Sequence, residues 1–167
     1  MVALELIQTY YTYNRWANRR ILSFAEKLTP TQFTAKVGAS FDSVRDTLVH
    51  TMNVERNWIC RCRELPLSPN VEFDQVEDLA TIQQHWAQIE ATTEAYISTL
   101  DETMLARVIQ YINSRGHPNA FPIWQMLLHQ GNHAMQHRSE VAVMLTQFGH
   151  SPGDMDFLIY LDSLPKS

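Results

Sequence analysis

Three histidines recur at four-residue intervals in the last third of the 167-residue chain, at His129, His133 and His137. On a helix each interval turns the side chain by about 40° and rises by about 6 Å, so the three imidazoles stack along one face. Two neighbouring imidazoles of such a stack can share one divalent metal ion. The apolar periodicity puts His133 and His137 on the inner seam of this helix, where polar groups need partners. This position favours metal ligands over the alternative, two core histidines held only by hydrogen bonds.

A third ligand has to come from another helix, because one helix face cannot provide tetrahedral or facial geometry by itself. His50 lies at the edge of the buried stripe of an earlier predicted helix, on the same flank as Thr47 and Trp58. We therefore predict a divalent-metal site built from His50, His133 and His137.

The elements that must position these residues are visible in the apolar periodicity. Apolar residues repeat at alternating spacings of three and four over four long segments, which is typical of helices that bury one stripe in a bundle. The chain has no internal repeat and one long connection, so we predict an all-α fold with one domain over residues 1–167, a four-helix bundle of the up-down-down-up type. The predicted helices cover residues 2–28, 42–64, 79–100 and 122–148.

Three smaller features are predicted between and after these helices. A capping-box pattern at residues 29–32 predicts a brief turn after the first helix. Weak alternation over residues 107–112 and a turn at 113–116 predict a small hairpin before the last long helix. Asp154 is the predicted cap of a short C-terminal helix that runs through Tyr160.

Four segments resemble the DinB-like family, a group of four-helix-bundle proteins. They are YNRWAN at residues 13–18, LVH at 48–50, HQGNHAMQHR at 129–138 and GHSPGD at 149–154. In that family the histidine of the second helix and the last two histidines of the fourth-helix motif form a metal triad. The resemblance therefore assigns the same three ligands, His50, His133 and His137, and it implies a homodimer.

Three neutral imidazoles leave the charge of the ion uncompensated and a coordination position open, which is typical of a catalytic site. A water or a thiol in that position would lose its proton more easily, so the site could catalyse either hydrolysis or thiol transfer. Imidazole ligands do not select one metal; zinc and nickel are expected first, then iron or manganese. The resemblance favours a metal-dependent transferase that uses a low-molecular-weight thiol. The alternatives are a metal-dependent hydrolase and a non-catalytic metal-binding stress-response protein.

Four further residues are candidates for the site. His129 lies one turn before His133 and is a candidate proton relay, or else a buried, hydrogen-bonded histidine. Glu55 is a candidate base, ligand partner or salt-bridge residue on the inward stripe of its helix. Asn14 and Asn18 interrupt an apolar seam, where they could orient a bound group or fix the register of the helices.

Arg138 and Glu140 follow the last predicted ligand, where many relatives have Arg-Gly-Gln and this chain has Arg-Ser-Glu. The resemblance makes Arg138 a possible anchor for an anionic substrate. Its place beside the seam also fits an ion pair between helices, and we expect a structural role for both residues.

The composition limits the partners. Thirteen Lys and Arg against eighteen Asp and Glu give a formal net charge of −5 with no basic stripe, so nucleic acid is not an expected partner. No apolar run reaches the roughly 20 residues that cross a bilayer, and Glu5 interrupts the place of a signal peptide, so we expect a cytoplasmic protein that does not span a membrane. Cys60 and Cys62 point to different sides of a helix and are expected to be reduced.

Overall fold

The computed structural model describes residues 4–38 and 40–165 and confirms the predicted helical bundle. The four long helices each end within a few residues of their predicted limits. These are α1 (Leu4–Ala25), α3 (Val44–Cys62), α4 (Leu79–Ser98) and α6 (Ile123–Gln147). The short elements are α2 (Pro30–Thr34), the 3-10 helix η1 (Phe73–Gln75), α5 (Glu102–Ala106), β1 (Val108–Ile112), β2 (Pro118–Pro122) and α7 (Phe157–Asp162).

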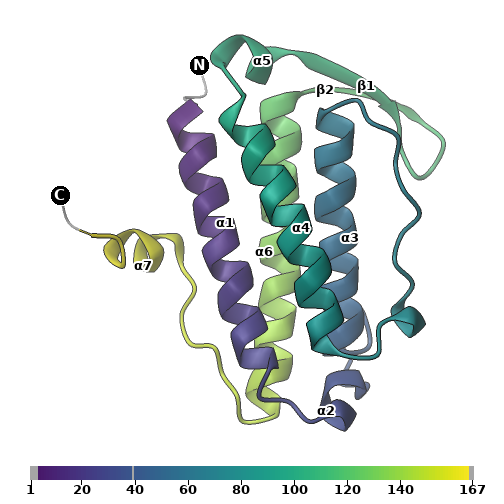
Figure 1. Ribbon diagram of the computed structural model, residues 1–167, viewed down its shortest axis with the longest axis vertical. Coiled ribbons are helices and arrows are strands. Elements are labelled where there is room, and N and C mark those ends of the chain that lie inside the picture. The colour runs from purple at the N-terminus through teal and green to yellow at the C-terminus, as the bar shows by residue number, and fades with distance from the viewer. Residues whose placement is uncertain (1–3, 39, 166–167) are drawn as a thin grey trace.

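The long helices follow the predicted up-down-down-up order. Helices α1 and α6 run in one direction, and α3 and α4 run in the other (Figure 1). Helices α4 and α6 each pack against both α1 and α3. Because α3 and α4 are parallel, the segment between them must return along the whole bundle, and η1 lies in this connection. In the described part of the chain, no helix combines the length and apolarity that crossing a membrane would need.

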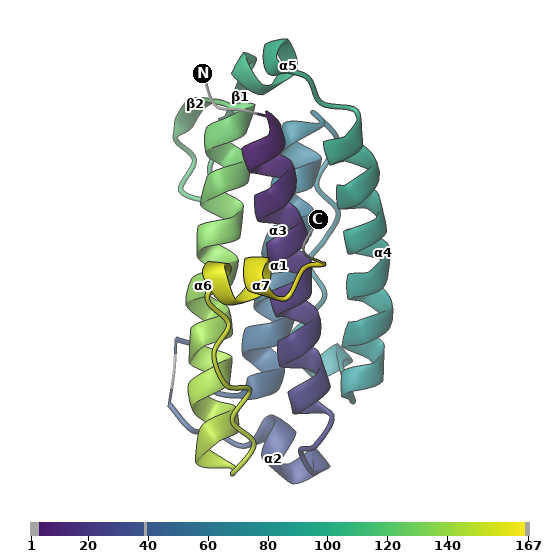
Figure 2. The same ribbon diagram turned by 90° about the vertical axis from the view of Figure 1, so that its left-hand side faces the viewer.

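The capping and hairpin predictions are confirmed, with one correction at the C-terminal end. The capping box between Thr29 and Gln32 is present at the start of α2. Asp154 does not cap the last helix: α7 begins after Asp156, whose side chain makes no capping hydrogen bond. The Tyr13 hydroxyl donates to the Met155 carbonyl at 2.9 Å, which ties the intervening segment to α1 before the helix starts. Helix α7 then crosses α1 near its middle (Figure 2).

Strands β1 and β2 form the predicted antiparallel hairpin, with Ile112 opposite Pro118 beside the turn. The Asn113 side-chain oxygen accepts the backbone N–H groups of Arg115 and His117, which closes the turn. Strand β1 contacts α3, and Tyr111 of β1 meets the Trp58 ring edge-on at 5.7 Å. The hairpin thus forms a wall beside the C-terminal half of α3.

A polar layer separates the two larger apolar clusters of the bundle, and a third, smaller cluster of Tyr13, Ala17 and Tyr160 lies between α1 and α7. One cluster occupies the end where α3 and α4 begin, and it includes Leu48, Met52, Ile82, Trp86, Val141 and Met144. The other lies at the opposite end and includes Ile7, Ile59, Ile97, Ile123, Met126 and Leu127. Between them lie buried polar side chains from three helices: Asn14, Asn18, Glu55 and Arg138.

Hydrogen bonds join this polar layer across all four long helices. The Arg138 guanidinium on α6 donates to the side-chain oxygens of Asn14 and Asn18 on α1. Asn18 donates from its amide to Glu55 of α3 at 3.3 Å. The same Glu55 oxygen accepts the indole N–H of Trp86 on α4 at 3.0 Å. Since each buried polar group needs these partners, the network fixes how the helices are rotated and aligned.

Burial dominates the electrostatics of this layer. It raises the pKa of the Glu55 carboxyl from 4.5 to about 7, although the Trp86 hydrogen bond and the Arg138 charge lower it. It also lowers the pKa of Arg138, against the opposing effects of Tyr13 and Glu55. The carboxyl group therefore loses its proton near neutral pH instead of in acid.

The raised pKa of Glu55 predicts how the stability of the protein depends on pH. The folded protein holds the proton more tightly than the unfolded chain, so the contribution of Glu55 to stability falls as pH rises from about 4.5 to about 7. The quantity to follow is the difference in free energy of unfolding between wild type and Glu55→Gln. This difference should fall by about 3 kcal/mol between about pH 4.5 and 7 and then level off. Urea unfolding of both proteins at several pH values measures it, and titrations common to both proteins cancel in the difference.

Glu94→Gln is the matched control, since Glu94 lies on the surface of α4, where its side chain is 64% exposed and paired with Arg15. It removes a carboxylate that water already solvates, so the change should cost at most about 1 kcal/mol. A profile for Glu55→Gln that does not change with pH would contradict the raised pKa.

Candidate metal centre

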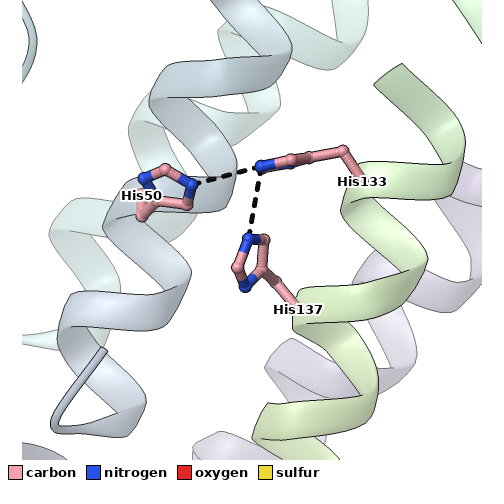
Figure 3. Close-up of side chains that lie close together, drawn as sticks. All are labelled: His50, His133 and His137. Atoms are coloured by element: carbon pink, nitrogen blue, oxygen red, sulfur yellow. Dashed lines mark hydrogen bonds between the residues drawn. The ribbon is translucent and has the colours of Figure 1, made fainter. Parts of the chain in front are cut away.

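The structure brings His50, His133 and His137 together between α3 and α6, as the spacing predicts (Figure 3). The Nε2 atom of His133 lies 3.3 Å from Nε2 of His50 and 3.2 Å from Nε2 of His137. One ligand atom from each of the three side chains lies within 4.8 Å of those of the other two. They form the candidate metal site of the described chain.

Two helices position these side chains. His50 is in the second turn of α3, and its ring stacks on Phe41 with 4.0 Å between centroids. His133 and His137 lie one turn apart on α6 and face α3. His137 is buried, with 4% of its surface exposed, whereas His133 is only partly buried, in contrast to the predicted inner seam. The 40° offset between the two positions turns His133 toward the groove, which opens one side of the cluster.

The nitrogen positions suit a small divalent cation. Zinc lies about 2.0 to 2.1 Å from imidazole nitrogen, so two ligands of a tetrahedral ion lie about 3.3 Å apart. The two Nε2 separations of 3.3 and 3.2 Å have this value. An ion held by these three imidazoles would have room for a further ligand, such as a water or a thiol.

A carboxylate supports one of the three histidines. The Nδ1 atom of His137 lies 2.9 Å from an oxygen of Glu140, one turn later on α6. Because an ionised carboxylate only accepts hydrogen bonds, Nδ1 carries the proton and the Nε2 lone pair points to the cluster. Burial would raise the pKa of Glu140, but hydrogen bonds from Ser40 and His137 outweigh it and lower the pKa. Glu140 thus has a more specific position than the general structural role predicted for it.

The other two imidazoles are neutral at neutral pH. Burial and, to a smaller extent, the nearby His137 lower the pKa of His50 from 6.5 to about 4. Burial also lowers the pKa of His133 to about 4, together with the other histidines of the cluster. The Nδ1 atom of His133 is buried with no hydrogen-bond partner in the described chain, so this ligand lacks the support that Glu140 gives His137. Neutral imidazoles have the free lone pair that a metal ion requires.

The segment before α3 supplies contacts that the sequence interpretation missed. Phe41 contacts the rings of both His50 and His137, and Ser40 donates to Glu140 at 2.6 Å. Both residues lie in an irregular connection without a periodic pattern. Only the three-residue spacing from His137 to Glu140 could have indicated part of this arrangement.

A pocket of about 670 Å³ opens beside the cluster, between α3, α6 and the hairpin. His50 and His133 line it, as does His129, whose ring packs against Trp58 at 4.7 Å. His129 is exposed, so it lies in the pocket and is not the buried histidine of the alternative interpretation. Burial of part of its ring lowers its pKa.

The structure does not bring the other candidates to this pocket. Glu55 lies five positions after His50, about 140° around α3, and it faces the interior instead of the groove. Asn14 and Asn18 bind Arg138 in the polar layer, in agreement with the register-fixing interpretation. Glu55 and Asn14 line a separate cleft of about 180 Å³ between α1 and α4.

Two solved structures of bacterial proteins show the same fold. A conserved protein from Enterococcus faecalis aligns with a TM-score of 0.65 and 12% identity over 87% of this chain and 96% of that one. A DinB family member from Shewanella denitrificans aligns with a TM-score of 0.64 and 16% identity over 99% of this chain and 92% of that one.

The sequence comparisons extend over the same length. The protein DinB of Bacillus subtilis (strain 168) is 26% identical over 159 residues, which cover 90% of this chain and 91% of that protein. The model of the DinB family matches residues 1–166, nearly the whole chain. The chain therefore belongs to the DinB family.

Proposed function

We propose that this protein binds one divalent metal ion through His50, His133 and His137 and transfers a low-molecular-weight thiol to an electrophilic substrate. The observation that carries the proposal is that Nε2 of His133 lies 3.3 Å from that of His50 and 3.2 Å from that of His137, beside an open pocket. A bound cation there would act as a Lewis acid that lowers the pKa of a thiol or a water in its open position.

The residues of the pocket favour a thiol over a water as the nucleophile. A thiol has a pKa near 8.5 and needs only a modest decrease, whereas bulk water has a pKa of about 15.7. A hydrolytic site commonly adds a carboxylate base to activate water, but no Asp or Glu is among the described residues that line this pocket. His129 is the neutral group that can accept the thiol proton there.

The role of Glu140 in this proposal is to hold His137. By accepting the Nδ1 proton it fixes the ring orientation and makes Nε2 a stronger electron donor. Phe41 stacks on His50 and contacts His137, so two of the three rings are constrained before an ion binds. A constrained set of ligands loses less conformational entropy on binding.

Metal content tests the first half of the proposal. Protein purified without a metal-affinity step should contain about one ion per chain, and His50→Ala and His137→Ala should each lose most of it, because two imidazoles bind an ion far more weakly than three. His85→Ala, a change at an exposed histidine of α4, is the control and should keep the ion. Equal metal content by elemental analysis in all four proteins would refute the triad.

Transfer of a thiol to monochlorobimane tests the second half of the proposal, the catalytic activity. The thiol sulfur forms a bond to the carbon that bears chlorine, chloride leaves with the bonding electrons, and the thiol proton passes through His129 to solvent. Zinc-loaded wild type should accelerate the appearance of the fluorescent thioether with a small thiol, and His129→Gln should lower the rate roughly 100-fold with the metal retained. Metal without thiol transfer, but with turnover of an activated ester, would instead support the hydrolase.

A further inference from the structure

The pocket beside the histidines has an unusual charge distribution for a protein with a net charge of −5. Its described lining contains the guanidinium of Arg61 and no carboxylate. Most of the remaining lining is aromatic, amide or imidazole in character. A polar ligand in this pocket therefore meets a positive charge with no negative charge beside it.

Arg61 is held by aromatic rings and not by an acidic partner. Its guanidinium carbon lies 5.0 Å from the ring centre of Trp58 and 5.2 Å from that of Tyr111. These contacts orient the planar group between α3 and the hairpin and leave its N–H donors available. In the described chain no ion pair or hydrogen bond engages the Arg61 side chain, whereas four other arginines are paired with carboxylates: Arg15, Arg19, Arg45 and Arg107.

Arg61 lies on the same face of α3 as the metal ligand. His50, Trp58 and Arg61 all line the pocket, with eleven residues or about 16 Å of helix from the first to the last. The stack on Trp58, three residues earlier, directs the guanidinium back toward His50. Trp58, which the guanidinium contacts, lies eight residues or about 12 Å of helix after His50.

We infer that Arg61 is a specificity-determining residue that binds the carboxylate of an anionic, extended thiol whose sulfur reaches the histidine cluster. The planar guanidinium can donate two parallel hydrogen bonds to a carboxylate, and the partly enclosed aromatic surroundings strengthen that pair. For the sulfur end of the ligand, this inference rests on the proposed function. The carboxylate end rests on the geometry of Arg61 alone.

Calorimetric titration with a pair of probes tests the inference. The probes are ω-mercaptooctanoate and ω-mercaptooctanol, which have the same chain length and differ in one charged group. Zinc-loaded wild type should bind the carboxylate at least about ten-fold more tightly than the alcohol, because a charge-assisted pair is formed. In Arg61→Gln this preference should vanish, while the affinity for the alcohol stays within about three-fold of wild type.

Two further variants separate position from charge. Arg63→Gln removes the same charge two residues later, at an exposed position outside the pocket, and it should keep the wild-type preference. Arg61→Lys should restore only part of the preference, because an ammonium cannot donate two parallel hydrogen bonds. If wild type shows no preference, or if the preference survives in Arg61→Gln, the inference is wrong.

Removing zinc with a chelator distinguishes this inference from the proposed function. If the proposed function holds, zinc removal weakens the binding of both probes, because both thiols lose their bond to the ion. If zinc has no effect on either thiol, the proposed function fails, and the ratio between the probes still reports on Arg61.

Discussion

A buried guanidinium constrains the whole bundle. Arg138 is 3% exposed, and a charged group so far from water is stable only where neighbouring groups satisfy it. Its partners are side chains of α1, which in turn connect to Glu55 on α3 and through it to Trp86 on α4. Apolar side chains on either side of this layer can slide past one another at moderate cost. The side chains of the polar layer cannot shift in this way, because a displaced helix would leave buried donors and acceptors without partners.

This constraint also determines where the histidines point. His137 precedes Arg138 by one residue, so the two side chains leave α6 about 100° apart. Once Arg138 is directed at Asn14 and Asn18 of α1, His137 faces α3, where His50 lies. The direction of His133, one helical turn before His137, then follows from helical spacing. The geometry of the candidate metal site is thus a consequence of a network that does not itself touch the pocket.

The sequence predicted those parts of the structure that depend on helical periodicity. The four long helices, the hairpin and the convergence of His50 with His133 and His137 all follow from spacing and burial patterns. Positions that depend on irregular backbone could not be predicted in this way, such as Phe41 against His50 and the start of α7 after Asp156. The partner of Glu55 also required the structure, since an inward carboxylate is compatible with a base, a ligand or a network residue.

The separation of the two polar regions has a chemical consequence for the pocket. Glu55, the acidic group that hydrogen bonds connect to Arg138 through Asn18, lies on the face of α3 that is turned away from the groove. Glu140 is also outside the pocket, where its contact with Nδ1 orients the His137 imidazole. The groove keeps only neutral imidazoles, aromatic rings, amides and Arg61. A divalent cation at the histidines would add to the field of Arg61, with no acid in the described lining to cancel it, so the pocket would attract anions although the protein as a whole is acidic.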